Sequence, residues 1–297
     1  MPTDRSIWRP LIPEPSAARC AAAGDVVVRE TPCKTLLQRS SLGDYSLNCY
    51  TGCAHGCAYC YARFMQRFHP HAEPWGAFVD VKINAVEVLK RQLRRAPPGE
   101  VFVSSACDGW QPVEEHYCLT RRCCELLVEH GFKVHVLSKS LLVRRDLDVL
   151  ARGKSQVGTT LTTLDEHLRA VWEPRAGSVA DRLALIDAAR QAGIETAVMF
   201  GPLLPGFSDS AATLSALLKQ AACRGVGVIW VDALNPRPRV WPALSALLRK
   251  HFPDLLEHYR RLLFDRTVRR DYLAELRRRV HEQAARLGLG ARVRVCF

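Results

Sequence analysis

The sequence predicts an α/β protein, a partial (β/α)6 TIM-like barrel followed by a helical extension at its C-terminal end. Two observations lead to this fold class. Short runs rich in β-branched residues alternate with amphipathic helical stretches along the middle of the chain. Gly131, Gly193 and Gly225 each stand between a helical stretch and the next such run, where glycine ends a helix readily. Alternating strands and helices give parallel strands with right-handed crossovers, and six units are two short of a closed barrel.

The elements follow in a regular order. Residues 1 to about 40 contain several prolines and show no sustained period, which predicts an N-terminal extension packed on the core. Residues 41–236 hold the barrel, and residues 237–297 form a basic C-terminal extension of two long helices, from about residue 242. The expected strands cover residues 45–50, 100–105, 132–137, 156–161, 195–200 and 227–232, and the expected core helices cover about 120–130, 144–152, 178–192 and 209–223.

The composition is that of a globular protein, with 48% hydrophobic and 24% charged residues. No apolar run follows the charges near the N-terminus, and the longest apolar stretch, residues 226–234, is too short to span a bilayer. We therefore expect a soluble, cytoplasmic protein with no membrane partner. In that compartment the 12 cysteines are reduced thiols, some of them metal ligands.

The net charge of +12 is concentrated near the C-terminal end. Residues 237–297 hold 15 Lys and Arg against six Asp and Glu. Such a region attracts phosphates, which favours nucleic acid as a partner. A solvated helix face in an arginine-rich protein explains the same pattern, and no zinc-finger or RNP motif decides between the two explanations.

Three cysteines with C-x3-C-x2-C spacing indicate the chemistry. Cys53, Cys57 and Cys60 can bind three irons of a [4Fe–4S] cluster and leave the fourth iron open to a substrate or cofactor. A zinc site is the main alternative, with His55 as a fourth ligand. Zinc usually takes two separated pairs of ligands, however, and only one C-x2-C pair exists here. A disulfide is less expected, because no secretory signal is present.

Polar residues follow five of the expected strands. Because the carboxyl ends of parallel strands share one face of a barrel, we expect these residues to line one pocket. A single Ser or Lys after a strand is usually a cap or turn residue, but five such groups are harder to explain in that way. They are residues 104–108, residues 138–140, Thr159 with Thr160, Thr162 and Thr163, residues 201–206, and Asp232 with Asn235.

Residues 51–63 read Thr-Gly-Cys-x3-Cys-x-Tyr-Cys-Tyr-Ala-Arg, which resembles the cluster loop of radical S-adenosylmethionine (SAM) enzymes. More narrowly, the chain resembles the spore photoproduct lyase-like family, also described as DNA repair photolyase-like. The resemblance covers about residues 35–235 and implies the partial barrel of the radical SAM type. Further similar segments are residues 108–114, 119–121, 138–140, 145–148 and 202–206, and Glu173 and Pro174 with Arg182.

The resemblance implies a [4Fe–4S] cluster and S-adenosyl-L-methionine as cofactors. In such enzymes an electron from a donor such as flavodoxin or ferredoxin cleaves SAM, and a 5′-deoxyadenosyl radical removes a hydrogen atom from the substrate. Tyr59 matches the aromatic residue that packs against adenine in the family. By order along the fold, Asp108, Lys139 and Thr160 are the candidates for contact with the methionine and ribose groups, Lys139 beside the carboxylate.

The family pattern breaks at one place. Spore photoproduct lyases resemble one another in a cysteine, taken to be the hydrogen donor, three residues before the aspartate that follows the second strand. Ser105 stands there in this chain, and its O–H bond is too strong to donate a hydrogen atom readily. Cys107 is the nearest candidate donor, and Tyr61 matches a family tyrosine thought to relay hydrogen atoms. Either residue can instead serve only in packing.

Three functions stay open on the sequence. The first is lyase-like radical SAM chemistry on nucleic acid, with pyrimidine photodamage as the substrate that the family suggests. The second is the same chemistry on an RNA base, a peptide or a small metabolite. The third is a non-catalytic iron–sulfur protein, which needs a fourth protein ligand such as Cys49 or His55. Because the C-terminal region has no clustered cysteines, we expect a single cluster.

Overall fold

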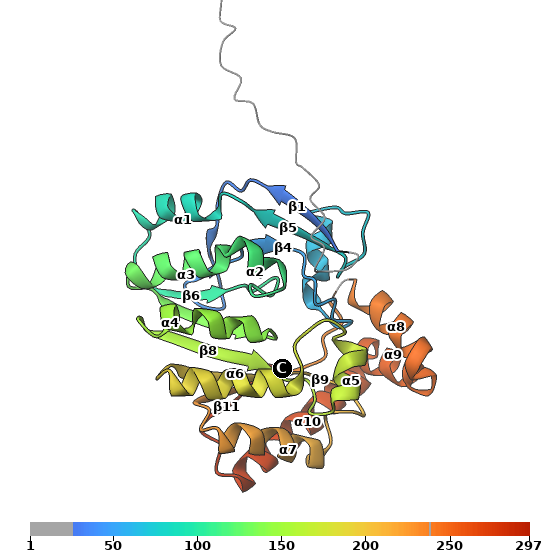
Figure 1. Ribbon diagram of the computed structural model, residues 1–297. Helices are drawn as coiled ribbons and strands as arrows, with labels where there is room; N and C mark the ends of the chain where they lie inside the picture. The colour runs from blue at the N-terminus through green and yellow to red at the C-terminus, as the bar shows by residue number, and fades with distance from the viewer. Residues whose placement is uncertain (1–25, 238) are drawn as a thin grey trace, which may run out of the picture.

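A central sheet of eight strands organises the computed structural model, which describes residues 26–237 and 239–297 (Figure 1). Six parallel strands follow one another across the sheet, as the sequence predicts. One further strand pairs antiparallel with β3 at one edge, and another pairs parallel with β10 at the other. In sheet order the strands are β11 (Val293–Val295), β10 (Val228–Ala233), β9 (Glu195–Leu203), β8 (Ser155–Thr160), β7 (Lys133–Ser138), β6 (Glu100–Val103), β3 (Tyr45–Leu47) and β2 (Leu37–Arg39).

The sheet is a partial barrel, because among the described residues the edge strands β2 and β11 do not pair with each other. Helices follow the strands and cover the sheet, with α6 packed on β8 and β9 and α3 on β7 (Figure 1). Strands covered in this way read as β-branched runs, and Val101 and Val103 of β6 are fully buried. The core helices are α1 (Ala85–Leu93), α2 (Val113–Tyr117), α3 (Leu119–Glu129), α4 (Leu147–Leu150), α5 (Glu166–Trp172), α6 (Val179–Gln191) and α7 (Ala211–Cys223).

A second sheet of three strands, in the order β1-β5-β4, was missed by the sequence analysis. It consists of β1 (Val27–Thr31), β5 (Phe78–Lys82) and β4 (Tyr50–Thr51). The expected strand over residues 45–50 is therefore split, with β3 in the large sheet and β4 in the small one. Of the expected N-terminal extension, residues 1–25 lie outside the described part, and residues 26–40 supply β1 and β2.

The C-terminal region contains three helices, so the prediction of two long ones was wrong. They are α8 (Val240–His251), α9 (Leu256–Phe264) and α10 (Arg266–Arg286). A short 3₁₀ turn begins at Pro253 and separates α8 from α9, because proline cannot continue a helix. Asp265 ends α9 and caps α10, accepting hydrogen bonds from the amides of Thr267 and Val268 at 2.9 and 3.1 Å. α10 packs on α7 and leads to β11 at the sheet edge.

Over the described ranges, 26–237 and 239–297, the helices are all too short or too polar to span a bilayer.

Candidate functional site

The three cysteines lie in a buried loop at the carboxyl end of the parallel strands, between β4 and the 3₁₀ helix η1 (Tyr61–Arg67). Cys53 and Cys57 are buried and Cys60 is half-buried, and all three are free thiols. Burial raises the pKa of each of them, and raises that of Cys57 to about 12. A metal centre that binds these sulfurs as thiolates must displace their protons. A strongly electrophilic metal centre can do this, because it deprotonates a coordinating thiol.

Residues far away in the sequence hold the cysteine loop. Gln111 is fully buried and accepts the amide hydrogen of Ala54 at 2.7 Å, while its own amide donates to the Gly52 carbonyl at 3.2 Å. On the other side, Gly56 and Gly76 approach so closely that a Cβ on Gly76 would lie 2.8 Å from the Gly56 Cα. The loop is therefore fixed from both sides. Gln111 lies in a family-like segment, but the sequence analysis gave it no role.

Asp108 joins the ends of two neighbouring strands. Its carboxylate accepts hydrogen bonds from the Ser138 hydroxyl at 2.8 Å, the Lys139 amide at 2.8 Å and the Trp110 amide at 3.0 Å. The Nδ1 atom of His55, inside the cysteine loop, lies 3.5 Å from the same carboxylate. Asp108 thus has partners within the chain for both oxygens and positions the segment of Lys139. Direct contact with SAM stays a prediction.

A buried network surrounds Tyr59. Its hydroxyl donates to the Glu173 carboxylate and lies 3.0 Å from the Thr162 hydroxyl. Glu173 pairs with Arg182, and the two side chains are 0% and 1% exposed. Burial raises the pKa of Glu173, but Arg182 and Lys139 outweigh that effect and lower it overall. Glu173 is therefore charged, and the network fixes the Tyr59 ring in the loop.

Lys139 lies over this network, with its Nζ atom 5.8 Å from the centre of the Tyr59 ring. Burial lowers the pKa of Lys139, but the nearby Cys57, Glu173 and Asp108 outweigh burial and raise it overall. Its ammonium group has no hydrogen-bond acceptor among the described residues, so its donors are available to an anionic ligand. Thr160 ends β8 near the same network, and its carbonyl accepts a hydrogen bond from Arg182 at 3.0 Å.

The expected hydrogen donor and relay residues lie on one rim of the loop. Tyr61 is 48% exposed, and its hydroxyl donates to the carbonyl of Ser105. Asn48 binds the Ala106 amide at 2.8 Å and lies 3.9 Å from the sulfur of Cys107. Burial raises the pKa of Cys107 to about 12, so this residue is a protonated thiol at neutral pH. A protonated thiol is the form that can donate a hydrogen atom.

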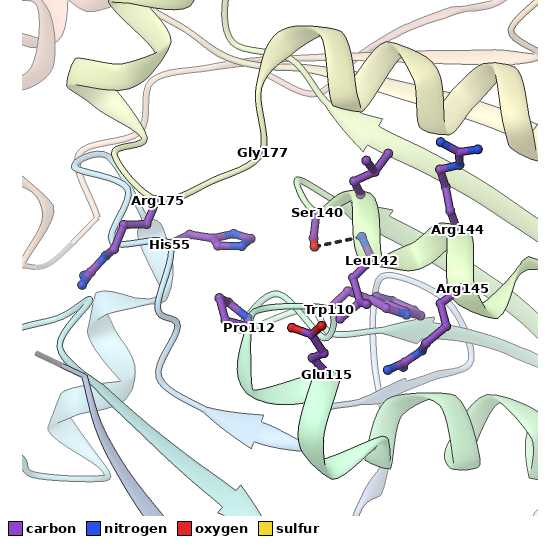
Figure 2. A pocket seen from close by; sticks show the side chains of 11 residues that line it. His55, Trp110, Pro112, Glu115, Ser140, Leu142, Arg144, Arg145, Arg175 and Gly177 are labelled. Carbon is purple, nitrogen blue, oxygen red and sulfur yellow. Dashed lines mark hydrogen bonds between the residues drawn. The ribbon is translucent and has the colours of Figure 1, made fainter. Parts of the chain in front are cut away.

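A separate cavity of about 670 Å³ borders the loop from another side (Figure 2). His55 faces it, but none of the three cysteines lines it. Arg145 on its wall is paired with Glu114 and Asp146, so part of its charge is already compensated. The cavity is lined by His55, Trp110, Pro112, Glu115, Ser140, Leu141, Leu142, Arg144, Arg145, Arg175 and Gly177.

The residues present fit a [4Fe–4S] cluster. In the described part of the chain, no three Cys, His, Asp or Glu side chains are grouped closely enough to hold a single metal ion. The ligands of a cluster bind different irons and stand further apart than the ligands of one ion. Two buried N–H groups near the cysteines, Trp75 Nε1 and Arg63 Nε, have no hydrogen-bond partner of ordinary geometry among the described residues. The sulfurs of a cluster are suitable acceptors for such donors.

Comparison with known proteins identifies the class. Residues 47–217 match the model of the Radical SAM superfamily, and the chain belongs to that superfamily. Members use a [4Fe–4S] cluster and SAM, which are therefore the cofactors of this chain. An uncharacterized protein of Mycobacterium tuberculosis (strain ATCC 25618 / H37Rv) is 33% identical over 227 residues. That match covers 73% of this chain and 66% of the relative, so the chain matches slightly less than two thirds of the relative's length.

Two further similarities are informative. A radical SAM Nalpha-GlyT isomerase of Pseudomonas phage M6 is 24% identical, over 80% of this chain and 50% of its own length. A spore photoproduct lyase mutant with bound AdoMet and dinucleoside spore photoproduct superposes with a TM-score of 0.67. Its sequence identity is 16%, over 93% of this chain and 83% of the other. At this identity the likeness shows a shared fold, while membership of the Radical SAM superfamily rests on the match over residues 47–217.

Proposed function

We propose that this chain is a lyase-like radical SAM enzyme that removes a hydrogen atom from a base in nucleic acid. Cys53, Cys57 and Cys60 would hold a single [4Fe–4S] cluster, and Lys139 would bind the SAM carboxylate. When bound, the cofactors supply one-electron cleavage of a sulfonium and a carbon radical. The observation that carries the proposal is the rim on which Tyr61 and the protonated Cys107 lie beside the cysteine loop.

The roles of the protein side chains follow from their positions. Asn48 and the Ser105 backbone hold Cys107 and Tyr61 at the rim. There the thiol would give a hydrogen atom to the radical left on the substrate, and the relay through Tyr61 would return a hydrogen atom to the sulfur. The buried Tyr59 and the Glu173–Arg182 pair fix one wall of the site and exclude water from it. An exclusion of water and of competing donors is what a carbon radical requires.

A nucleic-acid substrate is supported by two kinds of observation. The chain shares its fold with spore photoproduct lyase, solved with a dinucleoside spore photoproduct. A hollow of about 680 Å³ also gathers four arginines, with no carboxylate among the lining residues. The lining residues are Leu37, Arg39, Tyr45, Arg91, Gln92, Arg94, Arg95, Ala96 and Pro97.

The hollow lies at the opposite end of β3 from the cysteine loop, because Tyr45 begins that strand and pairs with Arg39. β3 has only three residues, so it spans about 10 Å next to the edge strand β2. The proposal therefore has a nucleic-acid strand run past this edge of the sheet, from the site to the hollow. Arg91, Arg94 and Arg95 also lie near the C-terminal end of α1, where one cation would be enough to compensate the helix dipole.

The first experiment tests the chemistry. Anaerobically reconstituted protein, reduced with dithionite and given SAM, should release 5′-deoxyadenosine, and a Cys57→Ala variant should not. DNA carrying photoproducts is then screened for turnover, which Cys107→Ala should lower while leaving 5′-deoxyadenosine release intact. Absence of 5′-deoxyadenosine from wild-type protein that holds an intact cluster would contradict the proposal and favour a redox carrier.

The second experiment tests the partner. Binding of a labelled single-stranded oligonucleotide is measured by fluorescence anisotropy at several salt concentrations. Replacing Arg94 and Arg95 by Ala should weaken binding and reduce the salt dependence by about two phosphate contacts. An Arg260→Ala/Arg278→Ala variant is the matched control, because both of these arginines are paired with glutamates. Equal losses in the two variants would contradict the role of the hollow.

A further inference from the structure

Trp75 lies against the cysteine loop, in the connection between η1 and β5. It is 6% exposed and belongs to a small apolar group with Cys53 and Phe78, against which Cys60 packs. Its ring meets the Phe78 ring edge to face, with centres 5.9 Å apart and planes at 86°. The next residue, Gly76, is held by the Arg175 guanidinium and by close approach to Gly56. The position of Trp75 relative to the loop is therefore fixed.

The indole N–H of Trp75 is buried and has no partner at hydrogen-bond geometry in the part of the chain that the structure describes. Buried donors in folded proteins are nearly always paired, so this atom needs an explanation. Trp110 shows the usual case, because its indole nitrogen donates to Asp146 at 2.8 Å. The indole nitrogen of Trp172 has no hydrogen-bond partner among the described residues either. Its ring is surrounded by aromatic rings, and the centre of the Phe252 ring lies 6.4 Å from its own.

The Cys60 sulfur is the acceptor that this part of the structure offers. Cys60 packs against the small apolar group that contains Trp75, and the indole N–H and the sulfur lie close enough to interact, although they do not form a hydrogen bond of ordinary geometry. A sulfur that ligates a cluster is anionic and accepts hydrogen bonds more strongly than a thiol, so as a ligand it can be the missing partner.

We propose that the Trp75 indole N–H donates a hydrogen bond to the Cys60 thiolate as a cluster ligand and raises the reduction potential of the cluster. The inference rests on the proposed role of Cys60. Reduction adds one negative charge to the cluster, and an N–H dipole that points at a ligand sulfur stabilises the more negative state. Trp75 is a positioning residue in this sense, because it acts on the cofactor through Cys60.

The test uses the reconstituted wild-type protein and a Trp75→Phe variant, which keeps an aromatic ring but removes the N–H. The midpoint potential of the cluster is measured by redox titration followed by electron paramagnetic resonance. We expect a more negative potential in the variant, at equal iron content. Trp230→Phe is the matched control, since Trp230 lies on β10 beside the edge strand and outside the group around the cysteines. An unchanged potential in Trp75→Phe would overturn the proposal.

A second measurement needs no variant. Wild-type protein labelled with ¹⁵N-tryptophan is reduced and studied by electron–nuclear double resonance, where the proposal expects a ¹⁵N coupling to the cluster. Absence of that coupling overturns it even where Trp75→Phe fails to fold. A Cys60→Ala variant separates the two levels of inference. If it still holds an intact [4Fe–4S] cluster, the ligand assignment itself is wrong, whatever the behaviour of Trp75.

Discussion

The surroundings of the cysteine loop and the C-terminal helices use charge in opposite ways. Beside the loop, the ion pair of Glu173 and Arg182 is buried, with exposures of 0% and 1%. On α9 and α10, the pairs are exposed, and Arg278 and Glu275 are 58% and 42% accessible. Breaking a buried pair leaves an uncompensated charge and costs about 3–5 kcal/mol, whereas a surface pair contributes about 0–1 kcal/mol.

This difference shows which region is held by contacts between distant parts of the chain. Family-like segments that are distant in the sequence meet around the loop: Gln111 binds the loop backbone, and Asp108 joins two strand ends. In the C-terminal region, by contrast, several arginines bind glutamates one helical turn away on the same helix. Those ion pairs join residues of one helix, and they compensate part of the positive charge that could otherwise attract phosphates.

The largest expected effect comes from Arg182→Ala. This change leaves the Glu173 carboxylate buried with its main cation removed, and it should lower the free energy of unfolding by about 3–5 kcal/mol at pH 7. Chemical denaturation of the variant and the wild type measures the loss. A loss below about 1 kcal/mol would mean that the buried pair behaves like a surface pair, which would remove the contrast between the two regions.

The same pair predicts a pH dependence. The pKa of Glu173 is lowered in the folded wild type, so its stabilising contribution is present above the unfolded pKa and is lost as the pH falls through the folded value. Without Arg182, burial raises the folded pKa of Glu173, so the difference in stability between wild type and Arg182→Ala should shrink as the pH falls from 7 toward 3. Denaturation curves from pH 7 to pH 3 test this. A difference that stays constant over that range would contradict a charged Glu173.

Gln111→Ala should have an intermediate effect. It leaves the buried amide of Ala54 and the carbonyl of Gly52 unpaired, at a cost of about 1–3 kcal/mol. Because those groups belong to the cysteine loop, we also expect less iron per protein after reconstitution. Gln220→Ala is a matched control, since the Gln220 side chain on α7 accepts a hydrogen bond from Arg224, four residues away. Full iron content in Gln111→Ala would show that the loop does not depend on this support.

The smallest effect is expected for Arg278→Ala on α10. Its partners Glu275 and Glu282 are themselves exposed, so the change should cost about 1 kcal/mol or less. The cost should fall further at high salt, because exposed pairs are screened. A double-mutant cycle with Glu275→Ala at low and high salt measures both. A coupling of several kcal/mol would mean that the extension is held by its charges as tightly as the loop region.

Patterns local in the sequence account for what could be predicted. β-branched runs and the glycines at 131, 193 and 225 defined six parallel strands, because periodicity and helix ends depend on neighbouring residues. The spacing of Cys53, Cys57 and Cys60 pointed to the superfamily. Strands of two to five residues, such as β1, β4, β5 and β11, were not predicted. So short a run shows little periodicity, and such a strand forms because it pairs with a neighbouring strand.

Local patterns in the chain were enough to predict the fold class, the superfamily and the residues from which a site could be built. How those residues are used depends on contacts between segments that are distant in the sequence. In the folded chain Gln111 binds the backbone of the cysteine loop, Glu173 binds Tyr59, and Trp75 lies beside Cys60. The physical reason is that hydrogen bonds between residues 50 or 100 positions apart leave no periodic trace in the chain. Their partners are fixed only when strands and loops converge at one end of the sheet.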